Sequence, residues 1–219
     1  DVYKRQIFKL GIIAIFISAV IDLIILYADR RKKGLIHEGS TEIFFVLFGT
    51  ILFVSVPLYF GYLINGHDLQ YHLLRIEGIK DGLLAGDFPI KIQSNWLKGN
   101  GYATAVFYGD LFLYIPAILR LCGFSIAQSY NIYVFLCNAA TCVIAYFCFK
   151  GMSGRRKTAA VGAVLYTTSI YRLLDVYVRS SVGEYSAMTF LPMIAYGLWK
   201  IYNDDCDEKN YKRNWIIPV

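Results

Sequence analysis

Two stretches of the sequence are apolar and free of charge over lengths that are unusual for a water-soluble chain. They are residues 43–64 and residues 121–149. About 20 consecutive apolar residues span the hydrocarbon core of a bilayer as a helix, and both stretches exceed that length. The pattern therefore predicts membrane-spanning helices.

Further apolar segments extend this pattern along the chain. The runs are continuous, whereas strands of a membrane barrel alternate between apolar and polar residues over about ten positions, so helices are favoured. The sequence predicts one all-α transmembrane domain over residues 7–219 that crosses the bilayer several times. The predicted spans are residues 7–27, 43–64, 125–149, 158–174 and 184–202, with another beginning at Trp215.

The segment 106–121 is apolar but also contains Asp110 and ends at Arg120. Lys and Arg accumulate in cytoplasmic loops, and the most basic connections share one side of the membrane only if this segment does not cross. We therefore predict a helix that lies in the outer interface, and a crossing helix is the alternative. Residues 65–123 and 171–184 then form two extracytoplasmic segments. The basic connections are residues 30–33, 150–157 and 200–213.

The composition agrees with a membrane protein. Of the 219 residues, 57% are hydrophobic and 17% are charged, whereas soluble domains carry about 25% charged residues. Basic cytoplasmic loops account for the net charge of +6, so we expect membrane lipids as partners and no nucleic acid. The five cysteines include no C-x-x-C pair and indicate neither a disulfide framework nor a zinc site.

Both ends of the sequence suggest a fragment. The chain lacks an initiator methionine, and it stops just as the apolar segment at Trp215 begins. Residues 1–6 also resemble translated sequencing-adapter sequence. We therefore expect these six residues to be non-native and assign them no function.

The first outer segment begins with a group of polar residues directly after a span. Apolar positions recur at helical spacing over residues 68–85, which predicts a helix lying on the membrane. Asp68, His72 and Arg75 share one flank of it. A carboxylate there suits general-base chemistry, and an arginine can hold a phosphate. The alternatives are a polar face that meets water, with Asp68 as the N-cap, or two metal ligands in Asp68 and His72, too few to predict a metal site.

The second outer segment places several charges between two short apolar spans. A glycine separates Arg179 and Glu184 from the bilayer edge, and ionisable groups this close to a membrane are costly unless they are paired or functional. A salt bridge between the two is the alternative to a functional role. Arg172 lies nearer to the apolar run and is predicted to extend its guanidinium to the interface.

Several short motifs lie in and beside the two outer segments. They are Gly66-His67-Asp68, Tyr71-His72, Arg75-Ile76-Glu77-Gly78, Gly86-Asp87-Phe88-Pro89, the run 107–117, Tyr171-Arg172, Tyr177-Val178-Arg179, Gly183-Glu184 and Ala187-Met188. Over residues 60–202 the chain resembles the bacterial multi-pass membrane proteins known as the 6-pyruvoyl-tetrahydropterin synthase-related membrane domain family. That name implies no pterin chemistry here. The family's layout is similar to the GT-C superfamily of membrane glycosyltransferases, which use polyprenyl-phosphate sugar donors.

This resemblance implies a location in the bacterial cytoplasmic membrane and roles for the polar residues. Asp68 matches the acidic position of the GT-C enzymes and would act as base on the acceptor. Arg179, with Arg75, would hold the donor phosphate, while His72 and Glu184 would orient these groups or assist a divalent metal. The candidate catalytic residues are Asp68 and Glu184, and the candidate substrate-binding residues are His67, His72, Arg75, Tyr177 and Arg179.

The resulting hypothesis is transfer of a sugar from a polyprenyl-phosphate-type donor to an extracytoplasmic acceptor. The alternative is a non-catalytic membrane protein, either a transporter or an assembly partner in cell-envelope biogenesis. A transporter concentrates polar groups near mid-membrane on broken helices. The charges of this sequence gather at the ends of the predicted spans, which favours the enzyme.

Overall fold

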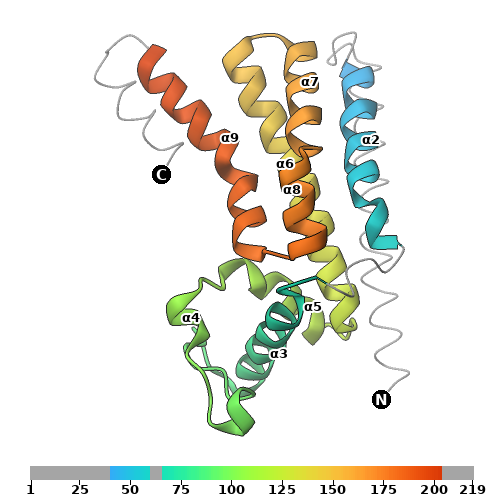
Figure 1. The fold of residues 1–219 in the computed structure, drawn as a ribbon. Coiled ribbons are helices and arrows are strands. Elements are labelled where there is room, and N and C mark those ends of the chain that lie inside the picture. Colours follow the sequence, from blue (N-terminus) through green and yellow to red (C-terminus); the bar gives the residue numbers. More distant parts are fainter. Residues whose placement is uncertain (1–39, 60–65, 204–219) are drawn as a thin grey trace. The chain divides into compact units, whose positions relative to one another are not determined.

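A computed structural model describes residues 40–59 and 66–203. The described residues are helical and include no strand, so the all-α prediction is confirmed for this part of the chain. The predicted span 7–27 and the segment from Trp215 lie outside it. The helices (Figure 1) are α2 (Ser40–Tyr59), α3 (Leu69–Ala85), η2 (Leu97–Gly99), α4 (Thr104–Phe107), η3 (Leu111–Leu113), α5 (Tyr114–Leu121), α6 (Ile126–Ser153), α7 (Arg156–Thr167), α8 (Ile170–Leu174), the π-helical turn η4 (Asp175–Arg179) and α9 (Val182–Asn203).

The chain divides into two compact units. The described part of the first unit comprises residues 40–42 and 74–130, and that of the second comprises residues 43–59, 66–73 and 131–203. The apolar pattern predicts one domain over residues 7–219.

Small side chains allow α6 and α7 of the second unit to pack closely. Ala145 on α6 and Ala159 and Ala163 on α7 are fully buried in a common cluster. A Cβ atom at Gly162 would lie only 2.9 Å from the ring of Phe149. The two helices therefore run side by side at close range (Figure 1), as small residues permit in helix pairs.

Polar side chains join α6 to its neighbours α2 and α9. Asn138 Nδ2 donates a hydrogen bond to Ser55 Oγ at 3.1 Å. The hydroxyls of Thr141 and Thr189 lie 2.9 Å apart. Hydrogen bonds between buried helix faces fix the rotation of each helix, which apolar contacts alone leave adjustable.

The predicted span 158–174 is not one continuous helix. The chain leaves helical geometry at Ser169 (φ −56°, ψ 135°), between α7 and α8. The Thr168 amide still donates to the carbonyl oxygen of Val164 at 2.9 Å, and the Thr168 hydroxyl donates to the same oxygen at 2.7 Å, so the helical ladder is intact up to Thr168. The π-helical turn η4 then ends at Ser180, which has a left-handed φ of 56°. Two interruptions therefore precede α9.

The predicted helix 106–121 is also divided in the first unit. α4 ends at Phe107, and helical structure resumes only in η3 and α5. The carbonyl oxygens of Tyr108 and Gly109 accept hydrogen bonds from Arg75 instead of from following amides. A long-range contact therefore interrupts a segment that is apolar enough to continue as a helix.

Two glycines allow a loop of the first unit to lie on α3. A Cβ atom at Gly78 would come within 2.6 Å of Gln93 Oε1, and one at Gly82 within 2.7 Å of Ile90 Cγ1. Gln93 is buried and donates from Nε2 to the carbonyl oxygen of Arg75 at 3.3 Å. The loop is thus fixed to α3 by both packing and hydrogen bonding.

Within residues 40–59 and 66–203, two helices are long and apolar enough to cross a membrane, judged by length and composition. They are Thr41–Tyr59 and Ile126–Ser153, each with a mean hydropathy of 2.0. The core helix of a soluble protein also passes this test, but such a helix is mostly buried. In Thr41–Tyr59 only 22% of the most apolar stretch is buried. Phe45 and Phe53 on this helix are 64% and 67% exposed.

Candidate functional site

The residues that precede α3 lie against the π-helical turn η4 of the same unit. The His67 amide donates to the carbonyl oxygen of Val178 at 3.1 Å. The Asp68 amide donates to the carbonyl oxygen of Arg179 at 2.9 Å. These two bonds connect the first predicted outer segment directly to the second.

A glycine is required for this approach. A Cβ atom at Gly66 would lie 1.9 Å from Ser180 Oγ and 2.7 Å from Ser180 Cβ. Contacts that short are impossible, so any side chain at Gly66 would separate the two segments. Close packing against Ser180 thus explains why the Gly66-His67-Asp68 motif begins with a glycine.

Arg179 lies at the centre of a group of charged side chains. Its Nη1 donates to Asp175 Oδ1 at 2.7 Å and to Glu184 Oε2 at 2.8 Å, while Nη2 donates to Glu184 Oε1 at 2.9 Å. The hydroxyl of Tyr171 donates to Glu184 Oε2 at 3.1 Å. The predicted ion pair between Arg179 and Glu184 is therefore present, and it is bidentate. We call Tyr171, Asp175, Arg179 and Glu184 the arginine cluster.

The carboxylates of the arginine cluster differ in their environments. The Asp175 side chain is 0% exposed, whereas that of Glu184 is 42% exposed. Burial raises the pKa of Asp175, the neighbouring Glu184 raises it further, and Arg179 opposes both effects. Hydrogen bonding to Glu184 raises the pKa of Arg179, which therefore stays charged. A carboxyl with a raised pKa beside a fixed cation is suited to hold or exchange a proton.

Asp175 is the member of this cluster that the sequence analysis did not select. Asp175 and Arg179 are four positions apart, a spacing at which opposite charges on a helix meet. That spacing was the available signal. Asp175 Oδ2 is buried and makes no hydrogen bond within the described residues, so one acceptor site of the carboxyl is unused.

Three of the predicted residues, Asp68, Arg179 and Glu184, meet at this place. The main chain of Asp68 bonds to that of Arg179, and Arg179 pairs with Glu184. The side chains of His67 and Asp68 are exposed and thus accessible to a ligand. Their catalytic and binding roles stay predictions.

Two other predicted residues of the second unit are buried. His72 is 1% exposed, so it does not form an open polar flank together with Asp68. Tyr177 is 7% exposed; its hydroxyl donates to the carbonyl oxygen of Val54 and accepts a hydrogen bond from Asn138 Nδ2 at 3.1 Å. In this structure both side chains face the protein interior rather than solvent.

Arg75 belongs to the first unit and is also fully buried. Its Nη2 donates to the carbonyl oxygens of Tyr108 and Gly109 at 2.8 and 3.0 Å, and its guanidinium lies 4.6 Å from the centre of the Tyr108 ring. Burial raises the pKa of the nearby Asp110, and the charge of Arg75 counteracts that shift. These contacts favour a structural role for Arg75, and its predicted contact with a phosphate remains a prediction.

Arg172 does not extend to an interface, contrary to the sequence-based expectation. It is 1% exposed, and its Nη2 donates to Asn138 Oδ1 at 2.8 Å and to Thr141 Oγ1 at 3.2 Å. Asn138 also bonds to Ser55 and Tyr177, so polar groups from four elements meet inside the second unit. An asparagine within a predicted span was the signal for this network, because buried amides need partners.

A metal site is not evident in the part of the chain that the structure describes. No group of three or more His, Cys, Asp or Glu side chains within 40–59 and 66–203 is arranged to hold a metal ion. The involvement of a divalent metal therefore gains no support from these residues.

Comparisons with known proteins give one distant relative. A protein of Lactococcus lactis subsp. cremoris, described only as uncharacterized, is 23% identical over 183 residues. The aligned region covers 80% of this chain but 30% of that protein, so the chain spans less than a third of its length. No family model and no solved structure matches the chain.

Proposed function

We propose that this chain is part of a multi-pass bacterial membrane glycosyltransferase with a GT-C-like layout. The carrying observation is that Asp68 is bonded through its main chain to Arg179 in the arginine cluster. The exposed carboxylate of Asp68 and the guanidinium of Arg179, on segments whose main chains are hydrogen-bonded to each other, are groups that base-assisted transfer from a phosphate-linked donor needs. The apolar, largely exposed α2 supports a location in the membrane.

The reaction would proceed by displacement at the anomeric carbon of a polyprenyl-phosphate-type sugar. Asp68 takes the proton of the acceptor hydroxyl while the oxygen of that hydroxyl forms the new bond to the sugar. The bond between the sugar and the phosphate oxygen breaks, and the phosphate leaves with the electron pair. Arg179 stabilises the charge that develops on that oxygen. Asp175 and Glu184 accept hydrogen bonds from Nη1 and Nη2 of Arg179, so the donor phosphate either displaces one of them or binds the remaining N–H groups of the guanidinium.

Replacing Asp68 tests this proposal. In the reconstituted full-length protein we expect Asp68→Asn to abolish sugar transfer from a labelled polyprenyl-phosphate donor, because the amide cannot accept the proton. Protein yield and melting temperature should stay unchanged, since the Asp68 side chain is exposed. Asp81→Asn removes a half-exposed carboxylate of the first unit and is the matched control. Full activity of Asp68→Asn would remove this residue from the mechanism.

A non-catalytic transporter is the second candidate, and one observation favours it. The buried network of Arg172, Asn138 and Tyr177 adjoins the broken stretch from α7 to η4. Buried polar groups beside interrupted helices are typical of transport sites. The fate of a labelled lipid-linked sugar separates the two candidates. An enzyme transfers the label to an acceptor, whereas a transporter moves the intact molecule across the bilayer.

A further inference from the structure

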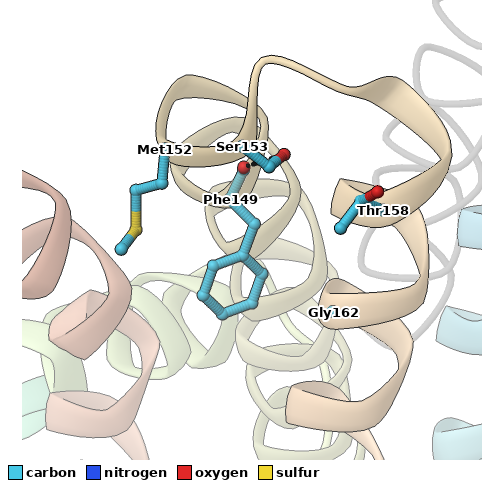
Figure 2. Close-up of a pocket in the computed structure, with 5 residues that line it drawn as sticks. All are labelled: Phe149, Met152, Ser153, Thr158 and Gly162. Atoms are coloured by element: carbon cyan, nitrogen blue, oxygen red, sulfur yellow. Dashed lines mark hydrogen bonds between the residues drawn. The ribbon is translucent and has the colours of Figure 1, made fainter.

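An apolar groove lies between the end of α6 and the start of α7. Its volume is about 270 Å³, and it is lined by Phe149, Met152, Ser153, Thr158 and Gly162. Figure 2 shows the Phe149 ring directed into the space between the helices, with the hydroxyls of Ser153 and Thr158 nearer to the connecting turn. The groove is close to the lower end, roughly 300 Å³, of typical small-molecule sites, so it has room for a segment of an apolar chain.

The turn beside this groove is strongly basic. Residues 150–157 contain Lys150, Arg155, Arg156 and Lys157 and no acidic residue. The first turn of α7 has no acidic residue either. Of these basic residues, Arg155 and Lys157 are exposed. A hydrocarbon groove that opens beside several cations is complementary to an amphiphile with an anionic head.

We propose that the groove binds one acyl chain of an anionic phospholipid, whose phosphate lies on the turn 150–157. This inference depends on the proposed membrane location but not on sugar transfer. Basic turns near a membrane surface attract anionic lipids, because each Lys or Arg adds to the electrostatic attraction. The groove adds a fixed place for the chain, which a general charge attraction does not provide.

Photocrosslinking can locate the bound chain. The protein would be reconstituted in phosphatidylcholine nanodiscs that contain a minor fraction of phosphatidylglycerol with a diazirine on its acyl chain. We expect adducts on Phe149, Met152 and Gly162 to exceed those on exposed apolar residues of α2 by several-fold. The same probe carried on phosphatidylcholine should lack this enrichment, because its head group has no net charge.

Variants separate the charge from the groove. Arg155→Gln/Lys157→Gln should lower the groove adducts several-fold, while Lys91→Gln/Lys98→Gln, which removes two charges from the first unit, should leave them unchanged. Thr158→Phe, which starts from an exposed rim position, should block the groove without disturbing the helix pair. Adducts spread evenly over the exposed apolar faces, or equal labelling by both lipids, would show ordinary annular lipid and overturn the proposal. Unchanged labelling of the charge variant would do the same.

Discussion

At the scale of single residues, burial distinguishes the two carboxylates that bind Arg179. Asp175 is enclosed and makes one hydrogen bond through Oδ1, while Oδ2 makes none within the described residues. Glu184 is half-exposed and binds the guanidinium through both oxygens. Glu184 is thus the stronger and more accessible partner of Arg179. Asp175 is the carboxyl of this pair whose pKa is raised, mainly because it is buried.

The pH dependence of stability should reveal Asp175. Its pKa is raised in the folded state, so ionisation disfavours folding as the pH rises through that value. Asn is neutral at every pH and avoids this loss. We expect the melting temperature of Asp175→Asn, relative to the native sequence, to rise between acidic and neutral pH in thermal unfolding experiments. A relative fall over the same interval would mean that the ion pair with Arg179 outweighs burial.

Glu77 in the first unit should show the opposite dependence. Burial alone would raise its pKa, but hydrogen bonds from Arg120 and Lys80 outweigh this and lower it below 4.5. Its stabilising effect is therefore complete above 4.5 and is lost as the pH falls through the lowered pKa. We expect Glu77→Gln to cost about 1 kcal/mol at neutral pH and little in strong acid. Denaturant titrations across this pH range, with exposed Asp87→Asn as control, would measure the difference.

At the scale of elements, the close contact between Gly66 and Ser180 allows the residues that precede α3 to pack against the end of η4. Gly66→Ala places a methyl group where Ser180 Oγ lies, and overpacking of this kind costs roughly 1–3 kcal/mol. Ser180→Gly removes both atoms that would clash and also suits the left-handed φ of 56°. We expect Gly66→Ala to destabilise the protein and the double variant to recover most of the loss, as measured by a thermal double-mutant cycle.

The absence of rescue would contradict this account of the Gly66 contact. If Gly66→Ala/Ser180→Gly is as unstable as Gly66→Ala, the glycine serves its own backbone conformation rather than the approach of η4. If Gly66→Ala is as stable as the native sequence, the two segments are not in close contact.

Unbroken apolar runs predicted the approximate positions of α2 and α6, and apolar residues at helical spacing predicted that of α3. Each of these helices follows its own local pattern. The interruptions were not predictable in this way. Arg75 divides the segment 106–121 by binding two of its carbonyl oxygens, and this contact exists only after folding. The break before α8 comes at Ser169, whose carbonyl oxygen accepts a hydrogen bond from the Leu173 amide at 3.0 Å, and the apolar pattern alone does not mark this position.

The candidate site was predictable only in part. Charges near span ends led to Asp68, Arg179 and Glu184, and their meeting follows from the path of the chain. Asp175 and Arg172 were missed as site and network residues because burial decides their behaviour. A charge in a short segment between spans can point outward or inward, and sequence spacing alone does not distinguish the two.

At the scale of the whole molecule, the proposal requires a specific membrane orientation. His67 and Val178 are exposed or half-exposed and joined by a hydrogen bond, so they must face the same compartment. The basic turn 150–157 follows the long apolar helix α6 and should face the opposite compartment.

Single cysteines in a cysteine-free version of the protein would report these positions. We expect His67→Cys and Val178→Cys to react with an impermeant maleimide in intact cells, and Arg155→Cys to react only after permeabilisation. Labelling of all three from outside would exclude a crossing by α6, and protection of both His67→Cys and Val178→Cys would place the site away from extracytoplasmic acceptors.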